Sequence, residues 1–239
     1  RRHAKVVNNF DNPEKLDAII IRAVDVTRDI IAKAKNLKVI GKHGVGCNNI
    51  DLEAAKEFGV PVINTPLANT NSVAELIVGL MLDISRNIAV CDEKSKKEGF
   101  SRIAPPEMTG IELTGKKVGL VGMGNIARRT GEILKKGFDV TLVGYDPYCS
   151  KEQAESYGIE KYESLEDMLE VADIVNVSVP LTKSTENMIS GEVFRHFKKS
   201  AILVNAARGG IVNEEDLYKA LKKGTLRAAA CDAFVHEPP

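Results

Sequence analysis

The stretch from Lys116 to Asp146 constrains the fold of this chain more than any other part of it. An apolar run that ends at Val121 leads directly into Gly122-Met123-Gly124-Asn125-Ile126-Ala127, and a helical pattern follows. In a G-x-G-x-x-A motif, the first glycine permits a tight turn from strand to helix, the second lets the backbone approach a pyrophosphate, and the small third residue lets the helix pack against the strand. Free N–H groups at the helix start would face the anion. The stretch therefore predicts a dinucleotide-binding βαβ unit.

The residues after the motif supply the context that a lone motif lacks. Side chains suited to one helix face recur at helical spacing, and Gly137 is placed where it would end the helix. A second strand is expected over 140–143 and leads to Asp146, roughly 20 residues after the first glycine, where a ribose-binding carboxylate is expected. The residues at helical spacing are Ile126, Thr130, Ile133 and Leu134. The alternative is that the glycines form an ordinary turn and that Asp146 is an ordinary loop acid.

Asp146 also predicts which nicotinamide cofactor is bound. A carboxylate there can accept hydrogen bonds from both ribose hydroxyls, whereas a 2′-phosphate would meet like charge at a cost of about 4 kcal/mol per unit charge at 4 Å and intermediate dielectric. Residues 147–150 contain no arginine that could pair with the phosphate. We therefore expect NAD rather than NADP.

Composition and charge exclude several classes of protein. Hydrophobic residues make up 44% of the 239, which is enough for a packed core, and 33 Lys and Arg balance 33 Asp and Glu. We therefore expect no nucleic-acid partner and no membrane partner, and the longest apolar run, Ala74 to Leu82, is too short to span a bilayer. The four cysteines are spread without a C-x-x-C pair and the four histidines do not cluster, so we expect free thiols in a reducing cytoplasm and no metal site.

Short apolar segments alternate with helical stretches over nearly the whole length, which is typical of parallel βαβ units. Ser72-Val73-Ala74-Glu75 is interpreted as a capping box that opens a long helix to about Ile88. This helix, the polar run at 92–102 and Pro105-Pro106 are together interpreted as a connection between two lobes. Later helices are expected to be capped by Ser164 and Asn213. The other expected strands are 18–21, 39–40, 60–63, 173–179, 201–205 and 227–231, and the expected helices of the first third are 29–34 and 51–58.

Two strand ends carry the residues most suited to chemistry. The expected strand at 201–205 leads into Ala206-Ala207-Arg208-Gly209-Gly210. In open α/β sheets, ligands bind beyond the carboxyl ends of strands, and an arginine there can donate two parallel hydrogen bonds to a carboxylate. A surface salt bridge is the alternative for Arg208. The strand at 227–231 leads into a segment that carries two acids, Asp232 and Glu237.

Ordered motifs along the chain are together more specific than any one of them. They are Gly44-Val45-Gly46-Cys47-Asn48-Asn49-Ile50-Asp51, Asn64-Thr65-Pro66, Ser72-Val73-Ala74-Glu75, the glycine-rich turn, Pro180-Leu181-Thr182, Asn205-Ala206-Ala207-Arg208-Gly209-Gly210, and Asp232-Ala233-Phe234 with Glu237-Pro238. The combination resembles the D-isomer-specific 2-hydroxyacid dehydrogenase family, and most closely its D-3-phosphoglycerate dehydrogenase-like branch.

That resemblance implies an α/β fold of two Rossmann-like lobes with parallel sheets. Residues 1–71 would be a smaller, flavodoxin-like substrate-binding domain, truncated, and residues 72–239 a doubly wound NAD-binding domain without its C-terminal part. The nicotinamide end of NAD would lie in a cleft between the lobes. The nucleotide-binding lobe would also form a homodimer or a higher homo-oligomer.

Carried over position by position, the resemblance implies roles along the whole cofactor. Backbone groups of Asn125 and Ile126 would hold the pyrophosphate, and Asp232 would bind the nicotinamide carboxamide. Val179 and the segment 206–208 would line the nicotinamide ribose. The full set of implied cofactor-binding residues is Val45, Gly122, Gly124, Asn125, Ile126, Asp146, Val179, Pro180, Ala206, Ala207 and Asp232.

The implied catalytic residues are Arg208 and Glu237. Arg208 would orient the substrate carboxylate and polarise its carbonyl, and Glu237 would pair with a histidine general acid/base and raise the pKa of that histidine. From the other lobe, Val45 and Gly46 would offer backbone N–H groups to the substrate and the cofactor. Arg22 resembles an arginine that meets acidic substrates, and a solvated side chain at a strand end is the alternative for it.

The sequence departs from the family pattern at positions that matter for catalysis. The histidine is expected after Glu237 and beyond Pro239, so we expect an incomplete enzyme with segments of both lobes missing. His236 precedes the glutamate, and a surface role is the favoured interpretation for it. Asn48 stands where an aspartate is usual, and Ser178 stands where a histidine is common.

The resulting hypothesis is an NAD-dependent oxidoreductase that interconverts a small D-2-hydroxy acid and its 2-keto acid. One alternative is a hydroxypyruvate or glyoxylate reductase, which would differ only in its substrate contacts. The other is a non-enzymatic, NAD-sensing scaffold of the corepressor type, which would keep the same motifs. The motifs do not identify the acid, because specificity depends on side chains that face each other across the cleft.

Overall fold

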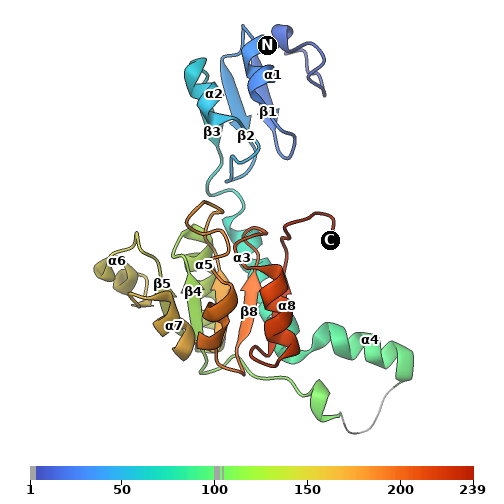
Figure 1. Ribbon diagram of the computed structural model, residues 1–239, viewed down its shortest axis with the longest axis vertical. Coiled ribbons are helices and arrows are strands. Elements are labelled where there is room, and N and C mark those ends of the chain that lie inside the picture. The colour runs from blue at the N-terminus through green and yellow to red at the C-terminus, as the bar shows by residue number, and fades with distance from the viewer. Residues whose placement is uncertain (1–3, 100–102, 104) are drawn as a thin grey trace. The chain divides into compact units, whose positions relative to one another are not determined.

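The computed structural model describes residues 4–99, 103 and 105–239, and the chain divides into two compact units, Arg1–Asn69 and Thr70–Pro239. Each unit contains a parallel sheet with helices packed against it (Figure 1), so the predicted α/β class is confirmed. The boundary expected between residues 71 and 72 lies inside the first turn of the helix that begins the second unit.

The first unit is a small sheet with its crossover helices. Its elements are the 3₁₀ helix η1 (Pro13–Lys15), β1 (Ala18–Ile21), α1 (Arg28–Lys33), β2 (Val39–Lys42), α2 (Leu52–Glu57) and β3 (Val62–Asn64), and the strands pair in the order β1-β2-β3. Ile19 and Ile21 are buried, whereas Ile20 between them is 85% exposed. Because side chains alternate along a strand, one face of this sheet carries the core of the unit.

The second unit is built on six parallel strands. They are β4 (Lys117–Val121), β5 (Thr141–Tyr145), β6 (Glu160–Lys161), β7 (Ile174–Val177), β8 (Ile202–Asn205) and β9 (Ala228–Cys231), in the spatial order β6-β5-β4-β7-β8-β9. From β4 the chain builds β5 on one side and later returns to place β7 on the other. Ligands bind doubly wound sheets at such a switch point, beyond the carboxyl ends of the strands. Gly122 and Ser178 directly follow these two strands.

Helices cover both faces of this sheet (Figure 1). On one face, α3 (Thr70–Arg86) and α5 (Asn125–Phe138) pack on the strands, with α6 (Lys151–Ser156) at the margin of the same cluster. On the other face lie α7 (Leu165–Val171), the 3₁₀ helix η3 (Gly191–His196) and α8 (Glu214–Lys222). Every residue of β7 and β8 is buried, which is typical of parallel strands covered on both faces.

The helix α4 (Ile88–Glu98) and the 3₁₀ helix η2 (Pro106–Met108) complete the second unit. No residue of α4, all of which the structure describes, is buried. Figure 1 shows α4 extending away from the sheet of its unit. Most of the polar run at 92–102 lies in this helix, and residues 100–102 lie outside the described part. The prediction that this run connects the lobes is therefore wrong, because the chain passes between the units at Asn69 and Thr70.

Two predicted helix boundaries are wrong, and each has a physical reason. α3 begins at Thr70, so Ser72 lies inside the helix and forms no capping box. The added turn includes Asn71, whose Oδ1 accepts from Arg129 Nε of α5 at 2.8 Å, a tertiary contact that local sequence does not reveal. α5 continues through Gly137 to Phe138, because Asp139 itself adopts the left-handed conformation (φ 51°) that ends the helix.

The two predicted N-caps in the second unit are confirmed. Ser164 Oγ accepts the backbone N–H of Asp167 at 3.0 Å, and Asn213 Oδ1 accepts that of Asp216 at 3.0 Å.

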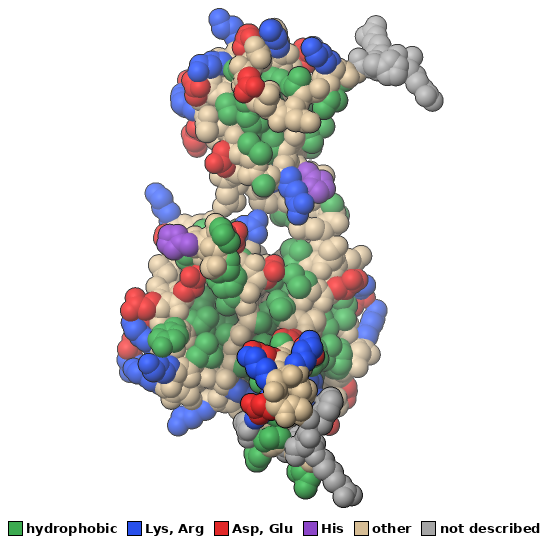
Figure 2. Space-filling model, turned by 90° about the vertical axis from the view of Figure 1, so that its right-hand side faces the viewer, with side chains coloured by type: hydrophobic (Ala, Val, Ile, Leu, Met, Phe, Trp, Pro, Cys, Tyr) green, Lys and Arg blue, Asp and Glu red, His purple; other side chains and the backbone are tan. Residues whose placement is uncertain are grey.

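Among the described residues, no helix is long and apolar enough to cross a membrane. Figure 2 shows Lys and Arg side chains interspersed with Asp and Glu on the face that it presents.

Candidate functional site

The carboxyl end of β4 meets the ends of its two neighbours through backbone hydrogen bonds. Gly122 donates its N–H to the carbonyl of Tyr145 at the end of β5, at 2.8 Å. The N–H of Ser178, after β7, donates to the carbonyl of Val121, also at 2.8 Å. The strand-to-helix turn is therefore held from both sides of the switch point.

The two glycines of this turn differ in what requires them. Gly122 has a φ of 87°, and a Cβ there would lie 2.7 Å from Val179 Cγ1 and 2.8 Å from the Ser178 carbonyl oxygen. The protein itself therefore excludes a side chain at Gly122. Gly124 has an ordinary φ of −72°, and a Cβ there would meet no atom within 4 Å. Open space over Gly124 is what a pyrophosphate approaching the backbone requires.

The start of α5 offers free hydrogen-bond donors beside this space. Gly124 is the N-cap residue and has no side-chain oxygen for the first turn. The first helical bond in this region runs from the Arg128 N–H to the Gly124 carbonyl at 3.0 Å, so the N–H groups of Asn125 and Ile126 precede it without helical acceptors. An anion at this helix start would meet these donors and the positive end of the helix dipole. The residues present thus fit a dinucleotide.

Asp146 lies at the end of β5, next to the glycine-rich turn. Its Oδ2 accepts the backbone N–H of Met123 at 2.9 Å, and its Oδ1 accepts that of Tyr148 at 2.9 Å. The side chain is partly exposed, so both oxygens retain lone pairs for further donors. The contact with Met123 ties the acid to the turn, which the sequence pattern did not predict.

The end of β8 is organised by a buried asparagine. Asn205 is 2% exposed, its Nδ2 donates to the Arg208 carbonyl at 3.0 Å, and its Oδ1 accepts the Ala207 N–H at 3.2 Å. The Arg208 side chain is exposed, and its guanidinium donates to the Ala207 carbonyl at 2.6 Å. The loop backbone is therefore fixed by the protein, while the guanidinium contacts only its own loop.

The segment after β9 packs directly on this loop. A Cβ at Gly209 would lie 2.0 Å from the Phe234 carbonyl carbon, so the two backbones are in contact. Asp232 donates its N–H to the Asn205 carbonyl at 3.0 Å. Glu237 Oε1 accepts the Phe234 N–H at 3.2 Å, so this carboxylate contacts its own segment. The structure thus brings the segments that carry Arg208, Asp232 and Glu237 together at the ends of two neighbouring strands, β8 and β9.

Sequence reasoning missed the partners that support these loops. The motif that contains Asn205 does not predict its two hydrogen bonds, and no sequence pattern predicts the contact in which Glu214 Oε1 accepts the Val235 N–H at 2.7 Å. The adjacent glycines Gly209 and Gly210 were the available signal for a close backbone approach. Val179, Pro180, Ala206 and Ala207 lie in the loops that follow β7 and β8, at the same edge of the sheet.

Two cysteines near this edge are poorly suited to act as nucleophiles. Burial raises the pKa of the Cys231 thiol, and the Glu214 carboxylate raises it further. Burial and then Asp146 raise the pKa of the Cys149 thiol. Since the thiolate is the reactive form, neither side chain is activated at neutral pH.

The remaining predicted residues belong to the first unit. Val45 and Gly46 lie in the loop after β2, and Val45 is 39% exposed. Within the described residues, the backbone N–H groups of Val45 and Gly46 donate to no protein atom. Arg22 directly follows β1 and is exposed. These donors and this cation thus lie at the carboxyl edge of the smaller sheet.

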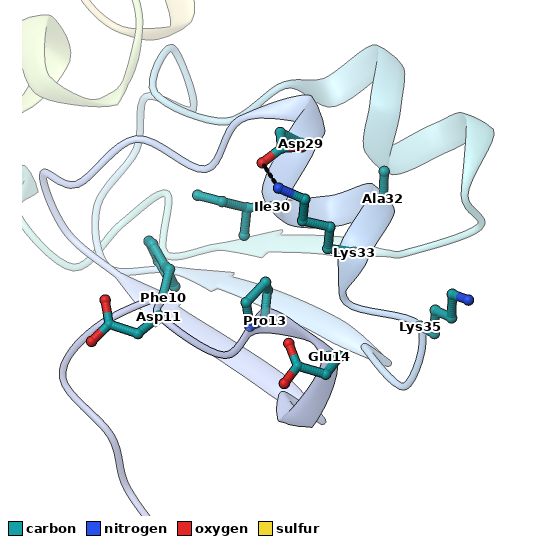
Figure 3. A pocket seen from close by; sticks show the side chains of 9 residues that line it. All are labelled: Phe10, Asp11, Pro13, Glu14, Asp29, Ile30, Ala32, Lys33 and Lys35. Atoms are coloured by element: carbon teal, nitrogen blue, oxygen red, sulfur yellow. Dashed lines mark hydrogen bonds and ion pairs between the residues drawn. The ribbon is translucent and has the colours of Figure 1, made fainter.

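A shallow pocket of the first unit lies elsewhere, between η1 and α1 (Figure 3). Its rim carries charges of both signs, including Lys33, which donates to Asp29 at 2.6 Å. Arg22, Val45 and Gly46 do not line it. Among the residues that the structure describes, no group of three or more His, Cys, Asp or Glu side chains could hold a metal ion.

Comparison with known proteins decides the family. Residues 78–239 match the family model described as "D-isomer specific 2-hydroxyacid dehydrogenase, NAD binding domain". This chain belongs to that family. NAD is thus the cofactor of the domain that holds the glycine-rich turn, and the predicted family and cofactor are confirmed.

Several relatives are similar over nearly the whole chain. D-3-phosphoglycerate dehydrogenase of Methanocaldococcus jannaschii is 46% identical over 93% of this chain and 42% of its own length. Hydroxypyruvate reductase of Thermotoga maritima is 40% identical over 94% of this chain and 71% of its own length. D-lactate dehydrogenase of Aquifex aeolicus, solved with NAD and lactic acid, superimposes with a TM-score of 0.85 at 28% identity, over 96% of this chain and 68% of that one. This chain therefore spans less than half the length of the phosphoglycerate dehydrogenase.

Proposed function

We propose that this protein is an NAD-dependent dehydrogenase that interconverts a small D-2-hydroxy acid and its 2-keto acid. The observation that carries the proposal is the glycine-rich turn at the switch point, with open space over Gly124 and free donors at the start of α5. Arg208 lies at the same edge of the same sheet, after β8. When bound, NAD would accept a hydride from the alcohol carbon or, as NADH, return it to the carbonyl carbon.

The cofactor would be held along this edge by backbone groups and one carboxylate. The N–H groups of Asn125 and Ile126 would bind the pyrophosphate, and Asp146 would accept hydrogen bonds from the adenosine ribose. Because Asp146 would repel a 2′-phosphate, we propose a preference for NAD over NADP. The nicotinamide end would contact Val45, Val179, Pro180, Ala206, Ala207 and Asp232.

The substrate would be oriented by Arg208, whose guanidinium can donate two parallel hydrogen bonds to a carboxylate. It would leave the Ala207 carbonyl to do so, and it would stabilise negative charge on the carbonyl oxygen during reduction. The N–H groups of Val45 and Gly46 and the cation of Arg22 are the proposed contacts from the first unit. Glu237 would support the histidine general acid/base that the family resemblance implies. The unit Arg1–Asn69 is thus proposed to bind substrate, and the unit Thr70–Pro239 to bind NAD.

A panel of acids tests the proposed activity. The complete protein would be assayed with NAD and 3-phosphoglycerate, glycerate, lactate or 2-hydroxyglutarate, with NADH formation as the measurement. At least one D-acid should be oxidised, and its L-isomer should not. Preference for glycerate, with reduction of hydroxypyruvate or glyoxylate, would favour the reductase alternative. NAD binding by calorimetry without turnover of any acid would favour the NAD-sensing scaffold and refute the enzymatic proposal.

We further propose a homodimer formed through the second unit. The support is α4, which extends from that unit without a buried residue and exposes Ile88 and Val90 by 54% and 58%. Light scattering should give twice the chain mass, and Val90→Lys should shift the equilibrium from dimer toward monomer. A wild-type monomer at micromolar concentration would refute the dimer.

The proposed location is the cytoplasm, supported by cysteines that are free at all four positions.

A further inference from the structure

Lys42 is an unusual lysine because it is buried. It is the last residue of β2 and is only 8% exposed, whereas lysines in folded proteins are almost always solvated. It directly precedes the loop that carries Val45 and Gly46. Among the described residues, no carboxylate lies within ion-pair distance of its ammonium group, so its burial is not explained by a salt bridge.

The Lys42 ammonium is instead bound to two oxygens of neighbouring loops. Its Nζ donates to the carbonyl of Arg22, which follows β1, and to Asn49 Oδ1 at 2.7 Å. Asn49 extends the connection, since its Nδ2 donates to the Val24 carbonyl at 2.6 Å and its carbonyl accepts the Val26 N–H at 2.8 Å. A single cation thus joins the loop after β1 to the loop after β2.

The same loop is held on its other side by the residues at the end of β3. Asn64 Nδ2 donates to the Val45 carbonyl at 2.8 Å, and the Gly44 N–H donates to Thr65 Oγ1 at 2.9 Å. These contacts use the Val45 carbonyl and leave the Val45 and Gly46 N–H groups free within the described part of the chain. The network therefore fixes the backbone and leaves these two donors available for a ligand.

We propose that Lys42 is a positioning residue that holds the loop 43–49 so that the N–H groups of Val45 and Gly46 are preorganised for the substrate. This inference rests on the proposed function for the role of those donors. When the donors are already in place, binding does not have to order the loop, so less conformational entropy is lost. The effect of Lys42 should therefore appear in substrate affinity. Lys42 itself would not touch the substrate, because its ammonium is occupied by Arg22 and Asn49.

The first experiment compares Lys42→Met with a matched control, Lys38→Met. Lys38 directly precedes β2, and it is exposed. In the complete protein, Lys42→Met should raise the amide hydrogen-exchange rates of residues 44–49 about tenfold or more, because hydrogen bonds to a charged donor are lost. It should raise the KM for the acid by a similar factor while the kcat stays within about twofold. Lys38→Met should leave all of these values unchanged.

A second variant keeps the proposal testable if Lys42→Met folds poorly. Asn49→Ala removes the other half of the connection and should give the same faster exchange and the same rise in KM. The double variant should be no worse than either single variant, because both act on one network.

The inference is overturned if loop exchange is unchanged in both variants, or if exchange rises while the KM for the acid does not. Absence of turnover in the wild-type protein would contradict the proposed function alone. The exchange measurement would then still decide whether Lys42 holds the loop.

Discussion

The carboxyl ends of the strands in the second unit are organised differently at β4 and β5 than at β8 and β9. At the end of β4 and β5, protein atoms hold the turn from both sides, and Asp146 accepts the Met123 N–H as well. At the end of β8 and β9, the backbone is equally fixed, but the Arg208 and Glu237 side chains contact only their own segments. At the end proposed to hold the cofactor, the recognition groups are therefore preorganised. At the end proposed to bind the substrate, only the backbone is preorganised.

The difference is consistent with what each end is proposed to recognise. A dinucleotide presents the same pyrophosphate and ribose each time, so backbone donors and one tethered carboxylate can be set in advance. A substrate carboxylate needs a long cationic side chain that can leave an internal acceptor and form a stronger, charge-assisted pair. Substitutions at five residues would test this contrast.

Arg208→Ala should have the largest effect. Loss of the guanidinium should lower kcat/KM about 10³-fold or more, because it removes a donor to the developing oxyanion as well as a substrate contact. The affinity for NAD and the melting temperature should not change, since Arg208 is exposed. Steady-state kinetics and calorimetry on the complete protein are the measurements. Arg195→Ala, which removes an exposed arginine of η3 paired with Glu192, is the matched control. A nearly normal rate would remove Arg208 from the mechanism.

Substitutions at the two glycines of the turn should have different effects, one mainly on stability and the other mainly on NAD binding. Gly122→Ala should destabilise the protein by about 2–5 kcal/mol, from a left-handed backbone and a clash with Val179 and Ser178. Gly124→Ala should leave stability equal or slightly higher, by about 0.4–1 kcal/mol, because its φ is ordinary. It should nevertheless weaken NAD binding about tenfold or more, since the methyl group would fill the open space. Thermal melts and calorimetry should be run on both, and equal NAD affinity of Gly124→Ala and wild type would contradict the assigned phosphate position.

Asp146→Ser should mainly change the choice of cofactor. Removing the carboxylate removes the repulsion of a 2′-phosphate, so the ratio of the NADP and NAD dissociation constants should fall about 10- to 100-fold. A small loss of stability should accompany it, because the Met123 and Tyr148 N–H groups lose their acceptor. Titration of both cofactors measures the ratio. An unchanged ratio would show that another group selects against NADP.

Asp173→Asn should have the smallest effect and tests the opposite edge of the sheet. Burial alone would raise the pKa of Asp173, but the Lys117 N–H and the Lys198 ammonium together lower it below 3.8. A lowered pKa stabilises the fold above the usual aspartate range, and this contribution is lost as pH falls through the lowered value. The variant should therefore lose about 1 kcal/mol at neutral pH, and the difference should shrink in acid. NAD affinity should be unchanged. Urea melts at several pH values measure the stability difference between wild type and variant, and a difference that grows in acid would contradict this prediction.

The sequence was most informative where one local pattern predicts both the backbone conformation and the kind of ligand that would bind there. The turn at Gly122 and Gly124 and the acid at Asp146 follow from steric and electrostatic rules within a single βαβ unit. The short apolar runs at β7 and β8 also predict strands, and every residue of both strands is buried, as is typical of parallel strands covered on both faces.

Contacts between distant segments set the limits of that reasoning. In the first turn of α3, Asn71 accepts a hydrogen bond from Arg129, and the buried Lys42 donates to Arg22 and Asn49. A lysine at a strand end looks like a solvated charge until the loops around it are placed. The sequence alone therefore predicts candidate site residues but not the partners that hold them.

The contact between Gly209 and the Phe234 backbone has a consequence for evolution and engineering of this protein. A methyl group at Gly209 would push the Arg208 loop away from the segment of Glu237, although Gly209 need not touch any ligand. In a saturation mutagenesis screen it should therefore tolerate replacement as poorly as a residue that performs chemistry. Redesign toward another acid would have to vary the neighbouring side chains and keep the backbone contact between Gly209 and Phe234.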